Sequence, residues 1–293
     1  MSVNGHMKNA ITIDLEDYYH VTAFADRLSA DEWASYKSRV EGNTERVLSR
    51  LAENNCHATF FVLGWVAEKY PQLIRRITEQ NHEIACHSLQ HRLVYQMTPA
   101  EFREDTCRAK QLLEDASGTP VRGYRAPSFS ITPEIPWAFE VLAELGFTYD
   151  SSVFPVHHLN YGMPRAPRFP FRIDTASGPI VEFPLPTLEV AGVRAPIGGG
   201  AYLRLLPYRY TRWAIRFFNQ EENHSACVYF HPWEIDPDQP RMQGSLTARL
   251  RHYIGLRGME VKLVRLMQDF EFGPLGTLVE QFREAEYSAA VEV

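Results

Sequence analysis

Three histidines occur within ten residues of the sequence, in the stretch HEIACHSLQH from His82 to His91. Two of them, His87 and His91, lie four residues apart directly after a short apolar run. Neutral imidazoles are common ligands of zinc and related divalent ions, and hydrolytic sites often combine two of them with one carboxylate and water. An HxxxH pair alone is a weak signal, because two solvated histidines leaving a strand would give the same pattern. The pair therefore needs a carboxylate from elsewhere in the chain.

Charged residues at the ends of other apolar runs supply candidates for that site. Asp14, Glu16 and Asp17 follow the first such run, in AITIDLEDYY. Taken one at a time, each candidate has an ordinary explanation: acids cap helices, an arginine forms a surface ion pair, and a histidine packs in a core. Their order, with one group at the end of each successive run, is much harder to obtain by accident. The remaining candidates at the ends of apolar runs are Arg125 in GYRAPSF, Asp150 in TYDSS and His231 in YFHPWE.

The elements that would position these residues alternate between strand-like and helical patterns. Short apolar runs at 10–14, 57–64 and 82–88 suit strands buried on both faces. Helical spacing of apolar residues follows at 43–55 and 64–81, and again at 247–270. Thr-Pro openings predict helices at Thr98 and Thr132, the first with a capping box to Glu101 and an end at Gly118. This alternation predicts an α/β fold with a parallel sheet, whose functional groups gather at the carboxyl ends of the strands.

A Pro- and Gly-rich stretch at about 155–210 interrupts the alternation. It carries nine prolines and a run of three glycines at 198–200. We interpret it as an insertion with little helix and one or two short strands, PIVEFPL (179–185) being the best candidate. Loops of this kind often border a substrate site. We expect one domain over residues 8–293 that includes this insertion, because 293 residues is an ordinary length for a single α/β barrel.

The composition argues against several classes of partner. Lys and Arg number 30 against 36 Asp and Glu, a net charge of −6 without a block of like charge, so we expect no nucleic acid partner, and the overall charge does not favour anionic lipid. No stretch reaches the ~18 apolar residues that span a bilayer, so we expect no transmembrane segment, and the N-terminus lacks the apolar core of a signal peptide. Four cysteines without CxxC spacing fit reduced thiols. We therefore expect a cytoplasmic protein; the sequence indicates no oligomeric state.

The order of these motifs resembles the polysaccharide deacetylase family, the carbohydrate esterases of family four with a nodulation-type deacetylase domain. HSLQH at 87–91 matches the family's H-[ST]-x-x-H, and RAPSF at 125–129 matches its R-x-P motif before an aromatic residue. YFHPW at 229–233 resembles the final L-x-H motif, and Asp150 fits the motif near the fifth strand. The family's opening acid pair, commonly TFDD, reads TIDLED here, so the spacing departs. The resemblance covers roughly residues 10–237.

More narrowly, five segments resemble the subfamily found beside exosortase and exopolysaccharide export loci: IDLEDYYHV, GYRAPSFSI, YDSSVFP, GGGAYLRLLPYRY and YFHPWEID. The resemblance implies a distorted (β/α)7 barrel. It also implies a metal-dependent hydrolase that removes N-acetyl or O-acetyl groups from a polysaccharide, here an exopolysaccharide. The implied partner is a polysaccharide or oligosaccharide substrate, and the implied cofactor is a divalent metal, with Zn²⁺ as the first candidate.

The family resemblance also assigns catalytic roles to four residues. Asp14 would be the general base, held ionised by paired hydrogen bonds from Arg125. His231 would be the general acid that protonates the leaving amine. Asp150 would raise the pKa of His231 and fix its tautomer.

The same resemblance places a metal between His87, His91 and one carboxylate. An alternating strand presents Asp14 and Glu16 on the same face, whereas Asp17 reaches that side only if the chain turns or bulges. We prefer Asp17 as the ligand for its short, stiff side chain and keep Glu16 as the alternative.

Substrate contacts and competing functions complete the expectations. Backbone N–H groups after Pro127, near Ser128 and Phe129, would stabilise the oxyanion. Trp233 and Tyr18 could wall a sugar site. The altered first motif leaves room for a metal-independent hydrolase of C–N bonds in small amides. A carbohydrate-binding protein that kept the fold without the chemistry is a further alternative.

Overall fold

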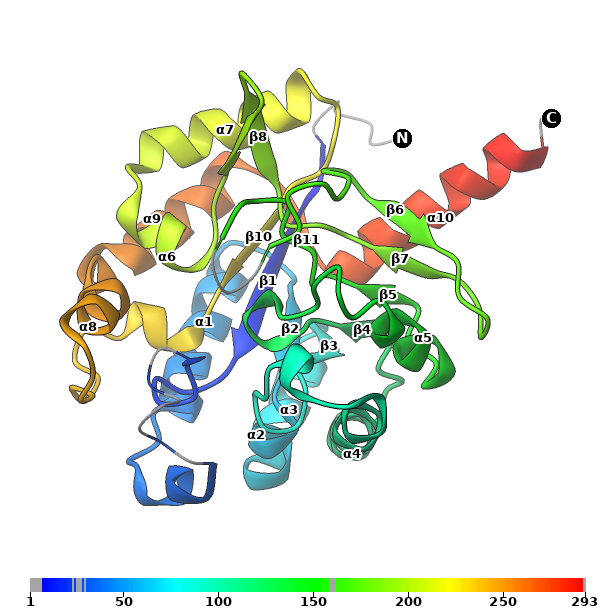
Figure 1. Cartoon of the computed structure of the whole chain (residues 1–293). Helices are drawn as coiled ribbons and strands as arrows, with labels where there is room; N and C mark the ends of the chain where they lie inside the picture. Colours follow the sequence, from blue (N-terminus) through cyan, green and yellow to red (C-terminus); the bar gives the residue numbers. More distant parts are fainter. Residues whose placement is uncertain (1–6, 23, 25–27, 29, 159–161, 292–293) are drawn as a thin grey trace.

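The computed structural model describes residues 7–22, 24, 28, 30–158 and 162–291. Its centre is a curled sheet with the strand order β10-β1-β2-β3-β4-β5-β7-β6, in which β11 also pairs with β1 (Figure 1). All pairings in this sheet are parallel except that between β6 and β7. The expected α/β fold is confirmed as a half-barrel sheet with helices outside it. The strands are β1 (Asn9–Leu15), β2 (Thr59–Val62), β3 (Glu83–Cys86), β4 (Gly123–Tyr124), β5 (Tyr149–Asp150), β6 (Phe171–Ile173), β7 (Ile180–Glu182), β10 (Cys227–Phe230) and β11 (Phe272–Gly273).

Strand β1 lies between β10 and β2, and all seven of its residues are buried. This matches its near-continuous apolar sequence, as expected for a parallel strand covered on both faces. Because the paired strands run parallel, β1, β3, β4, β5 and β10 all end at the same edge of the sheet. The candidate residues that follow these strands are thereby brought to one side of the molecule.

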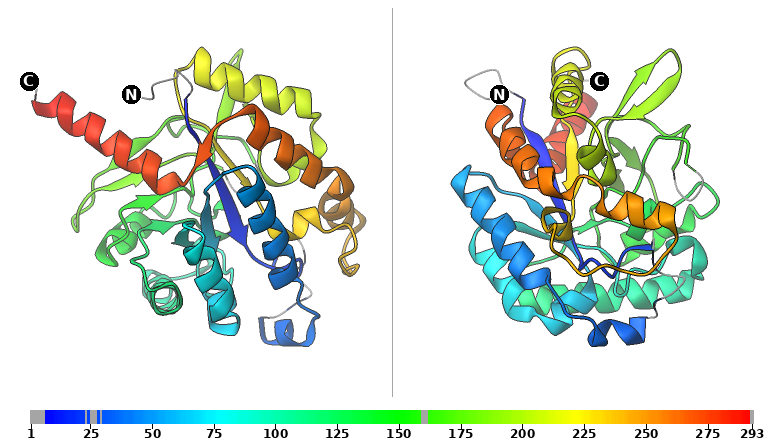
Figure 2. Two further views of the ribbon diagram at one scale, coloured as in Figure 1. Left: turned by 180° about the vertical axis from the view of Figure 1, so that it is seen from behind. Right: turned by 90° about the vertical axis from the view of Figure 1, so that its left-hand side faces the viewer.

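Helices pack around the outside of the sheet (Figures 1 and 2). Helix α4 begins with the predicted capping box between Thr98 and Glu101 and ends at Gly118, whose φ of 69° is left-handed. The first helices face β1 to β3 through a large core cluster that includes Ile13, Phe60 and Ile84. The helices are α1 (Val40–Glu53), α2 (Gly64–Lys69), α3 (Pro71–Glu79), α4 (Pro99–Ser117), α5 (Trp137–Glu144), α6 (Gly200–Leu205), α7 (Tyr208–Gln220), α8 (Leu246–Tyr253), α9 (Leu256–Asp269) and α10 (Leu275–Val291).

Three of the expected helices begin or break where the sequence pattern did not indicate it. The helical pattern at 64–81 is divided into α2 and α3 at Tyr70, because Pro71 disfavours helical backbone at the residue before it. Helix α5 starts at Trp137 rather than after Thr132, because Pro136 has no N–H to donate and disfavours helical backbone at Ile135. The helical pattern at 247–270 is divided into α8 and α9, because Gly255 adopts a left-handed φ of 80° between them. None of the helices within the described residues combines the length and apolarity needed to cross a bilayer.

The Pro- and Gly-rich stretch contains more regular structure than expected. The predicted strand in PIVEFPL is present as β7, which pairs with β5 and therefore belongs to the main sheet. A separate hairpin of β8 (Thr187–Val190) and β9 (Val193–Pro196) follows, and then α6. Residues 159–161 of this stretch lie outside the described residues. The expectation of one domain over residues 8–293 stays a prediction.

The close packing of β4 against β5 yields a test of the fold. A Cβ at Gly123 would overlap the ring of Tyr149, whose hydroxyl donates to Glu83 at 2.9 Å. We expect Gly123→Ala to lower the free energy of unfolding by about 1–3 kcal/mol, because the ring has no space to move into without losing its packing. Urea denaturation measures this difference in the free energy of unfolding, provided that the variant and the wild type have the same m-value. The control is Gly42→Ala in α1, where a Cβ meets open space, and it should be neutral or stabilising by up to about 1 kcal/mol.

Candidate active site

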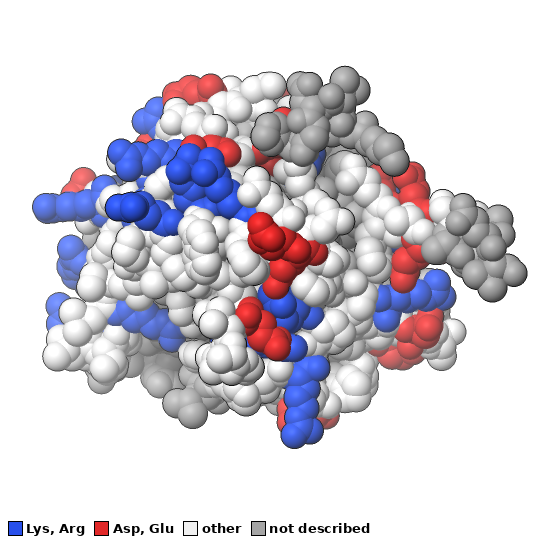
Figure 3. Space-filling view, turned by 90° about the horizontal axis from the view of Figure 1, so that it is seen from above, with Lys and Arg blue, Asp and Glu red and all other residues white. Residues whose placement is uncertain are grey.

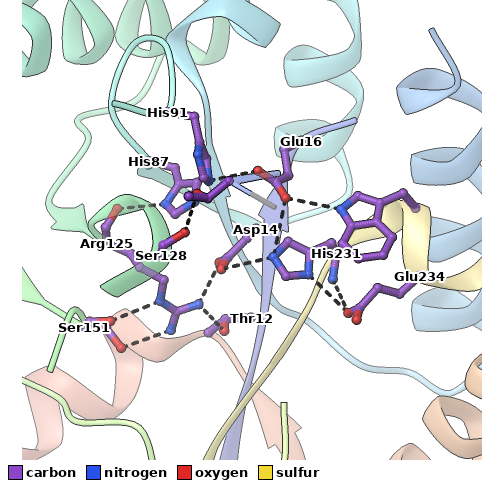
Figure 4. Close-up of polar contacts among 12 residues, drawn as sticks. Thr12, Asp14, Glu16, His87, His91, Arg125, Ser128, Ser151, His231 and Glu234 are labelled. Carbon is purple, nitrogen blue, oxygen red and sulfur yellow. Dashed lines mark hydrogen bonds and ion pairs between the residues drawn. The ribbon is translucent and has the colours of Figure 1, made fainter. Parts of the chain in front are cut away.

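The strand ends bring together side chains from three segments that are distant in the sequence (Figure 4). Asp14 and Glu16 come from β1 and the residue after it, and His231 follows β10. His87 and His91 follow β3, at the same edge. All five line a cavity of about 250 Å³. The structure thus places most of the predicted site residues around one cavity.

Asp14 and Arg125 form a buried ion pair at the base of this cavity. Nη1 of Arg125 donates to Oδ1 of Asp14 at 2.7 Å, and the Arg125 side chain has no exposed surface. This is a single hydrogen bond rather than the predicted pair, because Nη1 also donates to Thr12 and Nη2 donates to Ser151. Burial alone would raise the pKa of Asp14, but the charge and hydrogen bond of Arg125, together with His87 and His231, outweigh burial and lower that pKa below its ordinary value of 3.8. Asp14 is therefore ionised at neutral pH.

His87 presents one ring nitrogen to the cavity in a defined tautomer. Its Nδ1 lies 2.8 Å from the carbonyl oxygen of Arg125, which can only accept, so Nδ1 carries the proton. The lone pair then lies on Nε2, as in metal-binding histidines whose other nitrogen donates to a carbonyl group. Burial lowers the pKa of His87 to about 4 and that of His91 well below 6.5. Both imidazoles are neutral at physiological pH, as metal ligation requires.

His91 approaches His87 through an irregular loop, not along a helix face. Ser88 and His91 both have left-handed backbones, with φ of 67° and 56°, and the Ser88 hydroxyl accepts a hydrogen bond from the His91 N–H at 3.0 Å. This tight turn brings the two ring centroids to 5.4 Å. Residues four apart converge here because of the turn.

Glu16 completes the group of possible ligands. One oxygen of Glu16 and one nitrogen each of His87 and His91 all lie within 4.8 Å of one another. Oε2 of Glu16 is buried without a hydrogen-bond donor and lies 3.1 Å from Nε2 of His91, while Oε1 accepts from the Trp233 indole at 3.2 Å. Burial raises the pKa of Glu16 to about 7. Two neutral imidazoles beside a carboxylate with one unsatisfied oxygen fit a divalent cation such as zinc.

Asp17, the preferred ligand from the sequence, points elsewhere, so Glu16 replaces it as the candidate. The Asp17 carboxylate accepts from the Ser38 hydroxyl at 2.7 Å and from the backbone N–H groups of Arg39 and Val40 at 2.8 and 3.1 Å. It therefore caps the start of α1 instead of facing the imidazoles. Because side chains alternate between the two faces along β1, Glu16, the residue after the strand, points to the same face as Asp14. Asp17 would reach that face only if the chain bulged between them.

His231 is oriented by Glu234 rather than by Asp150. Oε2 of Glu234 lies 3.2 Å from Nδ1 of His231, and Oε1 accepts from the buried Arg204 at 2.6 Å. Burial alone would lower the pKa of His231, but the Glu234 carboxylate, with Glu16 and Asp14, raises it to about 9. Nε2 of His231 lies 3.6 Å from Glu16 and 3.9 Å from Asp14. His231 is therefore protonated at neutral pH and faces both acids.

Asp150 instead belongs to a buried acid pair behind Arg125. Its carboxylate accepts from the Ser152 hydroxyl at 2.7 Å and the Ser152 N–H at 3.0 Å. Glu182 is its partner across the register of β5 and β7, and burial beside Asp150 raises the pKa of Glu182 well above 4.5. The expectation that Asp150 tunes His231 is therefore wrong, because Asp150 is bound to β7.

The expected substrate contacts are met in part. Ser128 and Phe129 line the cavity, but the Phe129 N–H donates to the Ala126 carbonyl at 3.0 Å and is not available to an oxyanion. Trp233 also lines the cavity, whereas Tyr18 is in the core and donates to the Lys37 carbonyl. Pro127 is buried and precedes these residues in a 3₁₀ turn. A role for the Ser128 N–H stays a prediction.

Three further functional residues were missed by the sequence reasoning. Thr12 lies two residues before Asp14, so the period of a strand could have placed it on the same face. Glu234 lies three residues after His231, the spacing of a capping box, and its side chain also accepts from the His231 N–H at 3.0 Å. Arg204, from the Pro- and Gly-rich stretch, carried no local signal.

Comparisons with known families divide the chain into two matched parts. Residues 31–149 match the family described as polysaccharide deacetylase, and residues 151–280 match a domain of unknown function, DUF3473. The first match contains His87, His91 and Arg125, while Asp14, Glu16 and His231 lie outside it.

The similar proteins include two deacetylases. A peptidoglycan-N-acetylglucosamine deacetylase of Bacillus cereus is 31% identical over 33% of this chain and 36% of its own length. A chitooligosaccharide deacetylase of a Bradyrhizobium species is 34% identical over 34% of this chain and 43% of its own. The chain thus spans less than half the length of these relatives. The crystal structure of a putative polysaccharide deacetylase from Mycobacterium smegmatis shares the fold, with a TM-score of 0.62, 22% identity and coverage of 98% of this chain and 94% of that one.

The contact between Glu234 and His231 predicts a measurable change in titration. In metal-free protein, we expect Glu234→Gln to lower the pKa of His231 from about 9 toward its ordinary value of 6.5, because only Glu16 and Asp14 then oppose the effect of burial. NMR titration of the imidazole measures this. The raised pKa contributes stability that is complete below pH 6.5 and is lost as the pH rises through about 9, so the variant should lose less stability over this pH range.

Glu234→Asp serves as the second variant, because Gln leaves the Arg204 charge without its partner and weakens folding. It should keep the pKa of His231 closer to 9 than Glu234→Gln does, because it retains a carboxylate. An unchanged His231 titration in folded Glu234→Gln would show that other groups set this pKa.

Proposed function

We propose that this chain, whose residues 31–149 match the polysaccharide deacetylase family, is a metal-dependent hydrolase that removes acetyl groups from a polysaccharide or oligosaccharide. The observation that carries the proposal is one cavity that holds a possible metal-ligand set, an ionised acid and a protonated histidine side by side. Deacetylation needs an activated water, a base for its proton and an acid for the leaving group.

The proposed metal ligands are Glu16, His87 and His91. A divalent ion bound by such a set lowers the pKa of bound water and polarises a carbonyl group. Zinc is the first candidate, because two imidazoles and a carboxylate with an open position is a common catalytic zinc set. The hydrogen bond from His87 to the Arg125 carbonyl orients that ring for ligation.

The two groups opposite these ligands supply the proton transfers. Asp14 is the general base: Arg125 keeps it ionised, and its Oδ2 faces the cavity, so it can accept a proton from the attacking water. His231 is the general acid: it holds a proton that Nε2 can deliver to the leaving nitrogen or oxygen. Glu234 accepts the Nδ1 proton and stabilises the imidazolium until that transfer.

The substrate class follows from the named relatives, whose substrates are a peptidoglycan and a chitooligosaccharide. We propose an acetylated glycan of this general type, and we take an exopolysaccharide as the specific polymer that the subfamily resemblance implies. Trp233 lines the cavity and offers an aromatic wall to a sugar ring. A metal-independent amide hydrolase and a carbohydrate-binding protein without activity are the alternatives that the following experiments separate.

The metal assignment predicts that His87→Ala or His91→Ala removes bound metal and acetate release together. Each change deletes one of the two imidazoles of the proposed ligand group. Metal content by inductively coupled plasma mass spectrometry and acetate release from N-acetylated chitooligosaccharide measure the two effects. The control is His57→Ala, an exposed histidine, which should retain both. Full activity of the wild-type protein after complete removal of metal would favour the metal-independent alternative.

The base assignment predicts a separation of metal binding from turnover. We expect Asp14→Asn to retain metal and to lose activity by about 10²- to 10⁴-fold, because the amide cannot accept the proton. The exposed Asp115→Asn is the matched control and should behave as wild type. An Asp14→Asn protein that turns over as fast as wild type would remove Asp14 from the mechanism. Glycan binding without acetate release in the wild type would instead indicate a binding protein.

A further inference from the structure

Helix α8 carries an exposed apolar stripe beside the cavity. Leu246 and Leu250 are 70% and 55% exposed and lie on the same side of the helix, because they are four residues apart, and Ile254, which is 48% exposed, directly follows the helix. Ser245 caps the helix by accepting from the Ala248 N–H at 3.2 Å, and Gly255 follows the stripe. Helix α8 lies on the outer surface of the molecule (Figure 2, right). We call these three residues the α8 stripe.

The segment around the α8 stripe is positively charged in a chain whose net charge is −6. Residues 239–259 contain four arginines and no Asp or Glu. Arg249 and Arg257 are exposed, and neither forms an ion pair with any residue that the structure describes. Seen from above, basic side chains gather on the left of the molecule, the side of α6, α7 and α9 (Figure 3).

The opposite side of α8 is part of the cavity wall. Ala248 and His252 line the cavity, and the His252 ring stacks on Trp233 with centroids 4.2 Å apart. The main chain after the stripe is also fixed, because Arg204 donates to the Ile254 carbonyl at 2.7 Å. The α8 stripe therefore lies at a defined place beside the cavity.

We propose that the α8 stripe and the arginines around it bind an anionic phospholipid surface. Exposed leucine and isoleucine side chains on a helix flanked by arginines are the combination that lies in the interface of anionic membranes. A second copy of the chain fits less well, because a two-fold contact through α8 would bring the same arginines of both copies together. The proposal concerns binding alone and does not depend on the deacetylase activity.

Co-sedimentation of the full chain with lipid vesicles tests the proposal. We expect binding to phosphatidylcholine vesicles that contain phosphatidylglycerol, and binding weaker by about tenfold or more without it. The double variant Leu246→Glu/Leu250→Glu should lose binding by about tenfold or more, because two apolar groups become anionic. Arg249→Gln/Arg257→Gln and high salt should each weaken binding, because both reduce the charge attraction.

Val190→Glu/Val193→Glu is the matched control, the same number of charges introduced at two valines that are 63% and 69% exposed on the separate β8–β9 hairpin. It should bind vesicles as wild type does, and circular dichroism checks that every variant is folded. Equal binding by folded Leu246→Glu/Leu250→Glu, or no binding by the wild type, would overturn the proposal. A wild-type dimer that this double variant dissociates, without vesicle binding, would assign the stripe to a second copy instead.

Discussion

A positive charge buried without any contact with solvent is the constraint around which the site is built. The guanidinium of Arg125 is fully buried, and such a charge is tolerated only where a counter-ion and hydrogen-bond acceptors surround it. Asp14 provides the negative charge, while Thr12 and Ser151 accept further hydrogen bonds from the guanidinium group. The Cζ atom of Arg125 lies 4.1 Å from the centroid of the Phe61 ring. These partners come from β1, β2 and the end of β5. The requirements of one side chain therefore fix how the strand ends meet.

Backbone strain is concentrated at the same edge of the sheet. Of the eight non-glycine residues with left-handed backbones in the described part of the chain, Ser88, His91, Ser128 and Phe129 lie in the two loops at the site. Each such conformation costs of order 1–2 kcal/mol, so the surrounding structure must hold it. The loop at Ser88 brings the imidazoles together, and the loop at Ser128 carries two cavity-lining residues. Both loops follow short buried strands, which provide the rigid support.

Much of this arrangement could be predicted from the sequence, because it depends on patterns with a simple period. Apolar runs ending in polar residues identified the strand ends, and the Thr98 capping box gave the start of α4. The choice between Glu16 and Asp17 depended on where β1 ends, and the assignment of Asp150 depended on its pairing with β7. Both outcomes are set by contacts between distant segments that local sequence does not record. The role of Arg204 was hidden for the same reason, since its partner Glu234 is thirty residues away.

The position of Asp14 and Glu16 on a single strand has a consequence for how such a protein can diverge. Side chains of β1 alternate, so Thr12, Asp14 and Glu16 face the site while Ile11, Ile13 and Leu15 belong to the helix-covered core. Inserting or deleting one residue within β1 would turn both carboxylates into that core and expose the aliphatic set to the cavity. Insertions are harmless in the surface loops but not here. Related sequences can therefore keep both carboxylates in the site only if the part of β1 before Asp14 is lengthened or shortened by an even number of residues.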